Sequence, residues 1–270
     1  MSAEDYVLGR AVEDSVRLDA QHLLWRLQQG QLLHPDISLE DGQSIAEIGC
    51  GTGIWLLDLA QSVPNSIKLF GFDVSNRQFP PKEDWPENLS FGVLDSLQDV
   101  PADLLEKFDI VHVRMWASNI LPSDLPLLVG NIHRMLKPGG YLQWEEADLV
   151  DQVVRSDLAH EFERNINNLF ELAGLNYSWV SQLPTSLEEG NFDVLSFQRM
   201  TLKKSITQLG TNTYLLALRE ILSGIERRLK TASRVQQACS QSLDAMLQKT
   251  TPDLVYNWTP VCVLARKRWT

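Results

Sequence analysis

The chain has 270 residues, of which 44% are hydrophobic and 22% charged, as is typical of a globular protein with a proper core. Its net charge of −11 argues against a nucleic-acid partner, because such partners require clustered Lys and Arg. The three cysteines show no disulfide or metal-ligand spacing, and neither a signal peptide nor a membrane span is visible, so we expect a cytoplasmic protein with no metal and no membrane contact.

Residues 11 to 29 are predicted to form a helix that ends at Gly30. Five apolar residues recur at helical spacing and are expected to face the core, namely Val12, Val16, Ala20, Leu23 and Leu27. A flanking stripe of Leu18, His22 and Trp25 has no evident core role. His22 is therefore either a packing or surface residue or a residue that faces a ligand.

The next segment combines a buried strand, a glycine-rich turn and a helix. The strand is predicted over 44–48, the turn reads Glu47-Ile48-Gly49-Cys50-Gly51-Thr52-Gly53, and the helix runs over 55–60. Such a turn brings a ligand against bare backbone at a helix N-terminus. The dinucleotide fingerprint G-x-G-x-x-G would need a glycine at position 54, which is Ile54, so NAD binding is disfavoured.

A second strand is predicted over 67–72 and is followed by Asp73. This acid lies 20 residues beyond Gly53, which is the spacing expected of a carboxylate that accepts from both ribose hydroxyls. Residues 76 to 88 contain three prolines and predict an extended loop. A third strand over 89–93 leads to Leu94-Asp95-Ser96.

The fourth strand is predicted over 108–113. Alternation places Ile110, His112 and Arg114 on one side, and the carboxyl end of such a strand faces the ligand. His112 is either a core residue or a catalytic one. A helix over 125–136 then ends at Lys137-Pro138-Gly139-Gly140.

A fifth strand, over 141–144, runs into three acids that are candidate bases or hydrogen-bonding groups: Glu145, Glu146 and Asp148. The remaining chain predicts helices over 157–174, 178–189, 213–230 and 234–248, and strands over 191–203 and 255–266.

Several of these motifs resemble class I S-adenosylmethionine (SAM) methyltransferases. They are the turn from Glu47 to Gly53, the junction from His133 to Tyr141, and the N-terminal motifs Tyr6-x-Leu8-Gly9-Arg10 and Arg17-Leu18-x-x-Gln21. The N-terminal motifs are similar to those of LaeA-like enzymes of fungal secondary metabolism, in which this segment folds over the cofactor as a lid.

The resemblance implies an α/β, Rossmann-like sheet of seven mostly parallel strands, the last antiparallel, with helices on both faces and a helical lid. We expect a single domain over 1–270. Its parts would be an N-terminal lid over 1–40, a SAM-binding core over 41–150, and lid helices with the last two strands over 151–270.

The resemblance also assigns cofactor contacts residue by residue. Tyr6 and Arg114 would lie near the methionine part of SAM, Asp73 at the ribose, and Asp95 at the adenine, with Asp99 as the alternative to Asp95. Val74 and Ser96 would be further cofactor contacts. The turn would contribute Glu47, Gly49, Cys50, Gly51 and Gly53. The candidate catalytic residues are His22, His112 and Glu145. Methyl transfer expels a neutral leaving group, so positioning supplies much of the catalysis and no base is strictly required.

The sequence therefore predicts a SAM-dependent methyltransferase that acts on a small secondary metabolite, with oxygen favoured over nitrogen. Four tryptophans near the predicted site suit an aromatic, polyketide-derived or peptide-derived substrate, although each could equally be a core residue: Trp25, Trp116, Trp144 and Trp179. Two alternatives stay open. One is a LaeA-like regulator of secondary metabolism, and the other is a SAM-binding enzyme that uses the sulfonium charge in a pericyclic reaction.

Overall fold

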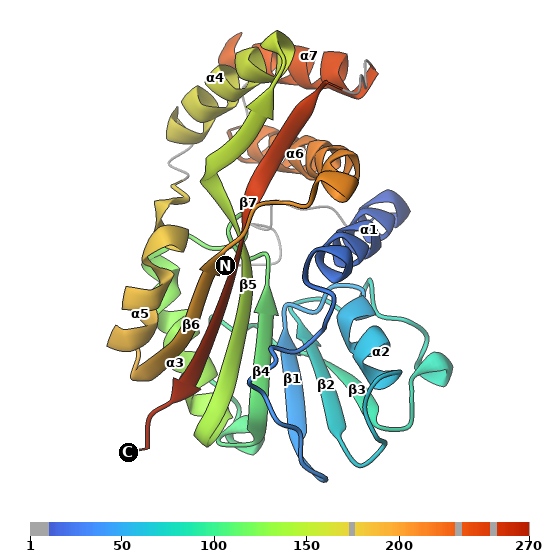
Figure 1. The fold of residues 1–270 in the computed structure, drawn as a ribbon, viewed down its shortest axis with the longest axis vertical. Helices are drawn as coiled ribbons and strands as arrows, with labels where there is room; N and C mark the ends of the chain where they lie inside the picture. Colours follow the sequence, from blue (N-terminus) through green and yellow to red (C-terminus); the bar gives the residue numbers. More distant parts are fainter. Residues whose placement is uncertain (1–10, 173–175, 230–233, 249–252, 270) are drawn as a thin grey trace.

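The structure is a computed structural model that describes residues 11–172, 176–229, 234–248 and 253–269. Its centre is one sheet in the order β3-β2-β1-β4-β5-β7-β6 (Figure 1). Neighbouring strands are parallel, except that β7 is antiparallel to β5 and β6. The strands are β1 (Ser44–Ile48), β2 (Lys68–Asp73), β3 (Leu89–Val93), β4 (Phe108–Arg114), β5 (Leu136–Arg155), β6 (Phe192–Arg199) and β7 (Val255–Lys267). The predicted seven-stranded Rossmann-like sheet is confirmed.

The helices follow the predicted order with shifted ends. They are α1 (Val12–Gln29), α2 (Ile54–Ala60), α3 (Leu125–Met135), α4 (Asp157–Leu172), α5 (Leu183–Glu189), α6 (Thr207–Leu229) and α7 (Arg234–Gln248). The helix predicted over 178–189 divides into a 3-10 turn at Ser178–Gln182 and α5. The loop over 76–88 contains only a 3-10 turn at Lys82–Asp84, as its prolines suggest.

Alternating side chains along the central strands bury two opposite faces. Ile45 and Ile110 belong to the cluster that packs against α2, whereas Val111 and Val113 belong to the cluster that packs against α3. This alternation is the period of two expected for a strand with a core on each side. The sheet therefore carries helices on both faces, as predicted.

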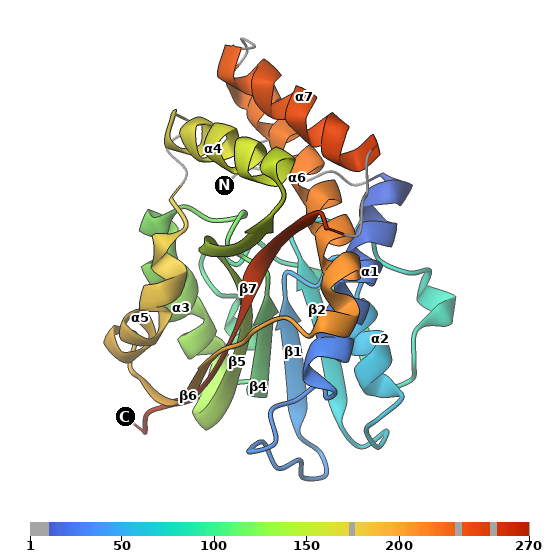
Figure 2. The ribbon, with the colours of Figure 1, turned by 45° about the horizontal axis from the view of Figure 1, so that its top comes forward.

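A cap of helices lies above the carboxyl ends of the parallel strands (Figures 1 and 2). β5 runs for 20 residues, far beyond the predicted 141–144, because it pairs with β7 from Tyr141 to Arg155 across a bulge between Asp148 and Gln152. These two extended strands reach α4, α6 and α7, and α6 packs beside α1 in both views. The cap therefore rises over the edge of the sheet where a ligand is expected.

The predicted core-facing stripe of α1 is wrong. Val12 is 77% exposed and Val16 61%, and Leu23 and Leu27 are also exposed. The buried residues of α1 come instead from the neighbouring side, namely Arg17, Gln21, His22, Leu24, Trp25 and Gln28.

This orientation of α1 has a physical cause in the contacts that its polar residues make. The Arg17 guanidinium pairs with Glu220 of α6, and Gln28 Nε2 donates to the carbonyl of Thr201 at 3.1 Å. The indole of Trp25 stacks on that of Trp258, with 5.4 Å between ring centroids. The cap supplies partners for these buried polar groups, so their desolvation is compensated.

Among the residues that the structure describes, no helix combines the length and apolarity needed to cross a membrane.

Candidate functional site

The glycine turn joins β1 to α2 and takes a backbone conformation that favours glycine. Gly49, Gly51 and Gly53 have φ values of +74°, +54° and +72°. The amides of Gly49 and Cys50 both donate to the carbonyl of Phe72, at 2.7 and 3.0 Å, which fixes the turn to the end of β2. A Cβ at Gly53 would lie 2.4 Å from the ring of Phe91, so close packing also requires glycine there.

A cavity of about 160 Å³ opens against this turn at the carboxyl edge of the sheet, roughly ten times the room that one water needs. Residues of the turn, of the ends of β2 and β4, and of α1 and α6 line it. Ten of the predicted site residues are among them: His22, Glu47, Gly49, Cys50, Gly51, Asp73, Val74, Asp95, Ser96 and Arg114.

The other predicted site residues lie elsewhere. Gly53, His112 and Glu145 are outside the cavity lining, although His112 and Glu145 contact residues that belong to it. The alternative adenine contact, Asp99, lies fully exposed beside Arg134. Tyr6 falls outside the described residues.

Two carboxylates on the cavity wall are suited to a polar ligand. Asp73 is held at the glycine turn, because its Oδ2 accepts from the amide of Gly51 at 3.0 Å and its Oδ1 from that of Ser75 at 3.1 Å. Glu47 is 4% exposed, and its Oε2 is buried with no hydrogen-bond partner among the described residues. Because a buried acceptor without a donor is costly, Glu47 fits a ligand that brings a donor such as an amine.

His112 lies behind the cavity and holds two carboxylates. Its Nδ1 is 3.3 Å from Glu47 Oε1, and its Nε2 is 3.4 Å from Glu145 Oε2. Its ring stacks on Trp55 with centroids 3.9 Å apart and is fully buried. Burial lowers the pKa of His112, but Glu145 and Glu47 outweigh it, so the pKa lies above its ordinary value. His112 thus lies behind Glu47 within ion-pair distance, although neither of its ring nitrogens makes a hydrogen bond among the described residues.

Arg114 links this pair of carboxylates to α1. Its Nη1 is 3.4 Å from Glu145 Oε2, and its Nη2 donates to Nδ1 of His22 at 3.2 Å. Burial alone would raise the pKa of Glu145, but His112 and Arg114 hold it below its usual value.

His22 has a partner at each ring nitrogen. With Nδ1 accepting from Arg114, Nε2 carries the hydrogen and donates to Asp58 Oδ2 at 2.9 Å. Burial and the positive charge of Arg114 lower the pKa of His22 to about 4, despite Asp58. The imidazole is therefore neutral and occupied, and it joins α1 to α2 and β4.

Glu146 is the acid of β5 that does line the cavity. Its Oε1 accepts from the amide of Ala147 at 2.9 Å, and its Oε2 accepts from the amide of Trp116 at 2.8 Å and from Nε1 of Trp144 at 3.1 Å. Complete burial raises the pKa of Glu146 to about 7 in spite of these donors. The third acid, Asp148, instead pairs with Arg199 at 2.9 Å and does not line the cavity.

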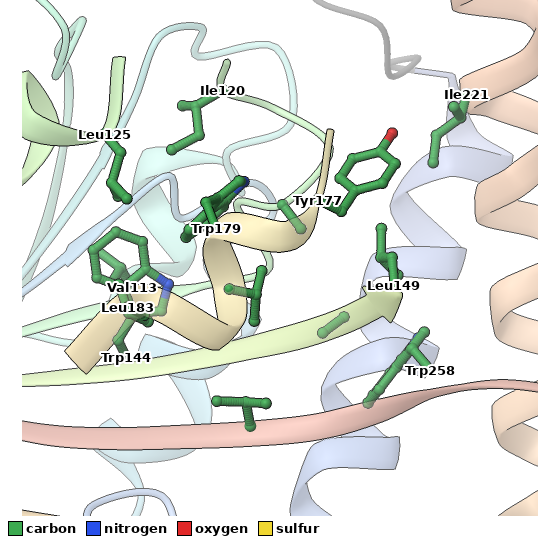
Figure 3. Packing of buried hydrophobic residues seen from close by; sticks show 14 of the residues in the cluster. Val113, Ile120, Leu125, Trp144, Leu149, Tyr177, Trp179, Leu183, Ile221 and Trp258 are labelled. Atoms are coloured by element: carbon green, nitrogen blue, oxygen red, sulfur yellow. The ribbon is translucent and has the colours of Figure 1, made fainter. Parts of the chain in front are cut away.

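A group of apolar and aromatic side chains forms another part of the wall: Leu149, Tyr214, Ala217, Ile221 and Trp258. In Figure 3, Leu149 and Trp258 lie close together on β5 and β7, and Ile221 projects from α6. Trp258 was missed from the sequence. The antiparallel direction expected of the last strand could have revealed it, because that direction brings the start of β7 to the carboxyl edge.

Of the four tryptophans considered for the substrate site, only Trp116 lines the cavity. Trp25, Trp144 and Trp179 are buried in the main hydrophobic cluster. Figure 3 shows Trp144 and Trp179 packed with Leu125, Leu183 and Ile120.

A Rossmann-like sheet with a glycine-lined cavity at its carboxyl edge is the arrangement in which α/β proteins commonly bind a cofactor or small molecule. Residues 28–196 match the methyltransferase domain family, and the chain belongs to this family.

Fungal proteins are among the relatives. The chain is 37% identical to the methyltransferase grgD of a Penicillium species over 59% of this chain and 58% of that protein. It is 30% identical to the N-methyltransferase verN of Clonostachys rogersoniana over 52% and 50%. It is also 35% identical to the secondary metabolism regulator laeA of Coprinopsis cinerea over 38% and 24%. The chain spans about half the length of the curated relatives it matches first.

Solved structures share the fold at low sequence identity. A putative methyltransferase in complex with the Haloferax volcanii Trm112 methyltransferase activator superposes with a TM-score of 0.54 over 95% of both chains, at 14% identity. The [4+2]-cyclase SpnF superposes with a TM-score of 0.50 over 93% of this chain and 82% of that chain, at 17% identity. These neighbours confirm the fold, and because they include a cyclase, the fold alone does not specify methyl transfer.

Proposed function

We propose that the chain is a SAM-dependent methyltransferase that acts on a small-molecule acceptor of secondary metabolism. One observation carries this proposal: two carboxylates line the cavity beside the same glycine turn. They are Glu47, whose buried Oε2 has no hydrogen-bond partner among the described residues, and Asp73, which accepts from the amide of Gly51. Glu47 would accept from the α-amine of the methionine part, and Asp73 would accept from the ribose hydroxyls. Asp95 and Ser96, which also line the cavity, would border the adenine.

SAM, when bound, supplies a methyl group on a positively charged sulfur, and the transfer releases a neutral thioether. The residues around the cavity then have to orient both reactants and exclude water. α1 contributes to the cavity and also contacts the glycine turn. Its Leu18, Gln21 and His22 line the cavity, and its Asp19 accepts a hydrogen bond from Thr52 Oγ1 of the turn at 2.8 Å. The contacts of His22 with Asp58 and Arg114 support a role in holding α1 over the turn.

The proton that leaves the acceptor needs a destination when the acceptor is weakly acidic. His22, His112 and Glu145 are engaged in the charge network described above, which supports positioning roles for them. Glu146 lines the cavity, where its oxygens already accept hydrogen bonds from Ala147, Trp116 and Trp144, and its pKa of about 7 lies near the working range of a general base. We therefore assign to Glu146 the hydrogen bond to the acceptor or the acceptance of its proton.

The acceptor is proposed to be a largely apolar molecule. Leu149, Ile221 and Trp258 offer apolar contact, and the nearby Arg17 is already paired with Glu220, which leaves it less free to bind an anionic substrate. The sequence favoured oxygen as the methylated atom. The name of the Clonostachys relative, an N-methyltransferase, supports nitrogen as an equal candidate.

A regulatory function is the second candidate, supported by the 35% identity to a secondary metabolism regulator. SAM binding would be common to both functions, so turnover of a small molecule distinguishes them.

Two experiments test the proposal. Isothermal titration calorimetry should show binding of SAM and S-adenosylhomocysteine (SAH) but not of NAD. Incubation with SAM labelled in its methyl group and an extract of the source organism should then yield labelled small molecules. Tight NAD binding without SAM binding would overturn the cofactor assignment. SAM binding with labelled protein and no labelled small molecule would favour the regulator.

A further inference from the structure

Trp116 has an unusual position directly after β4. The residue before it, Met115, has a φ of +58°, a left-handed conformation that is uncommon for a residue other than glycine. This turn directs the amide of Trp116 to Glu146 Oε2 at 2.8 Å and its indole Nε1 to the carbonyl of Ile48 at 3.2 Å. Left-handed residues held by surrounding contacts are concentrated at functional sites.

The indole of Trp116 is pressed against the first glycine of the turn. A Cβ at Gly49 would lie 2.9 Å from Cζ2 and 3.1 Å from both Cε2 and Nε1 of Trp116. Trp116 also lines the cavity beside Gly49. The side chain is thus placed at the turn by a hydrogen bond at its ring, a second at its amide and the absence of a side chain on Gly49.

The covalent order of SAM relates this position to the ligand. The α-amine lies at one end of the methionine chain, the sulfonium follows, and the ribose is attached to the sulfonium. If Glu47 receives the amine and Asp73 the ribose, the sulfonium belongs between them. Gly49 lies between Glu47 and Gly51 in the chain, and the amide of Gly51 bonds to Asp73. The indole against Gly49 is therefore beside the expected path of the sulfonium.

We propose that Trp116 is a specificity-determining residue that recognises the sulfonium charge through its aromatic face, so that the protein binds SAM more tightly than the neutral product SAH. This inference rests on the proposed function. Cations are attracted to the face of an indole, and the attraction grows when water is excluded. Such a contact retains the charged substrate and weakens retention of the product after methyl transfer.

The test compares the affinities of SAM and SAH in the wild-type protein and in the variants Trp116→Leu and Trp116→Phe by calorimetry. Trp116→Leu removes the aromatic face and should reduce the preference for SAM over SAH by roughly 3- to 30-fold, whereas Trp116→Phe should keep part of the preference. Trp269→Leu is the matched control. Trp269 also packs against a left-handed glycine, Gly139, but does not line the cavity. It should leave the preference unchanged.

An equal loss of SAM and SAH affinity in both variants would overturn the inference, since Trp116 would then only support the turn. Wild-type protein that binds neither ligand would instead overturn the proposed function. Circular dichroism checks that each variant folds. If Trp116→Leu does not fold, the preference measured in Trp116→Phe decides, and a value equal to that of the wild type would contradict the proposal.

Discussion

A buried carboxylate is tolerated when its oxygens find partners, and Glu47 has one only for Oε1. The acid before the glycines was predicted from the resemblance, but the way it is held was not. His112 lies behind it within ion-pair distance, and His112 itself lies within ion-pair distance of Glu145 and stacks on the ring of Trp55. No local sequence pattern predicts this network of contacts, because its four residues come from β1, β4, β5 and α2 and meet only when the sheet forms.

Asp73→Ala is expected to weaken both SAM and SAH by about 1.5–3 kcal/mol, the value of hydrogen bonds to a charged group. Because the ribose is common to both ligands, their affinity ratio should stay constant, unlike that of the Trp116 variants. Asp73→Asn should recover little, since an amide accepts at only one atom. Asp99→Ala, a change at a fully exposed acid, is the control in the calorimetric measurement. Normal binding by Asp73→Ala would refute the ribose assignment.

Glu146→Gln is expected to reduce the loss of stability that accompanies rising pH. Burial raises the pKa of Glu146 from 4.5 to about 7, so the folded state holds this proton more tightly than the unfolded state. The resulting stability is fully present below pH 4.5 and is lost as pH rises through 7. Its size is about 3 kcal/mol, from 1.36 kcal/mol per pH unit.

Urea unfolding at pH 5 and pH 8 measures this effect in the wild type, in Glu146→Gln and in the exposed control Glu83→Gln. The free energy of unfolding should fall less between the two pH values in Glu146→Gln than in the other two proteins. Identical pH dependence in all three would show that Glu146 does not titrate in this range.

At the scale of elements, periodicity predicted the positions of the helices and strands, but it predicted the wrong buried face for α1. The exposed stripe of α1 is the more apolar one, and the buried stripe contains Arg17, Gln21 and His22. Hydropathy alone assigns such residues to the surface. Partners that lie far away in sequence, Glu220 on α6 and Asp58 on α2, reverse that assignment. The second error, the length of β5, has a similar cause, because its extension depends on pairing with β7.

Two substitutions distinguish the observed orientation of α1 from the predicted one. Trp25 is 2% exposed and stacks on Trp258, so Trp25→Ala should cost about 3–5 kcal/mol of unfolding free energy. Leu23 is 49% exposed, so Leu23→Ser should change it by less than about 0.5 kcal/mol. Chemical denaturation measures both. A loss above about 2 kcal/mol for Leu23→Ser would mean that the exposed apolar stripe of α1 is buried against another surface in solution.

Across the whole molecule, the seven-stranded sheet with its antiparallel last strand was predictable because the alternation of strands and helices agreed with the resemblance to a known family. The cavity is lined by two parts of the chain that differ in how well the sequence predicts them. Part of its polar wall, including Glu47, Asp73 and Asp95, comes from the segment where motifs are specific, while α6 and β7 contribute Tyr214, Ile221 and Trp258, where no motif exists. Two of the residues proposed to contact the acceptor, Ile221 and Trp258, therefore lie in the part of the chain that sequence patterns described least.

Because the cavity is built from α1, the turn, β4, β5, α6 and β7, a ligand bound there should stabilise the whole fold. SAH at 100 times its dissociation constant should add about 2.7 kcal/mol. For a chain of this size, that corresponds to a rise in Tm of roughly 5–10 °C. If Asp73→Ala weakens binding about 30-fold, the same SAH concentration should raise its Tm by only about 2–3 °C, and NAD should raise neither. Differential scanning fluorimetry across a series of SAH concentrations measures these shifts. A Tm that does not depend on SAH concentration in the wild type would show that SAH does not bind the folded protein.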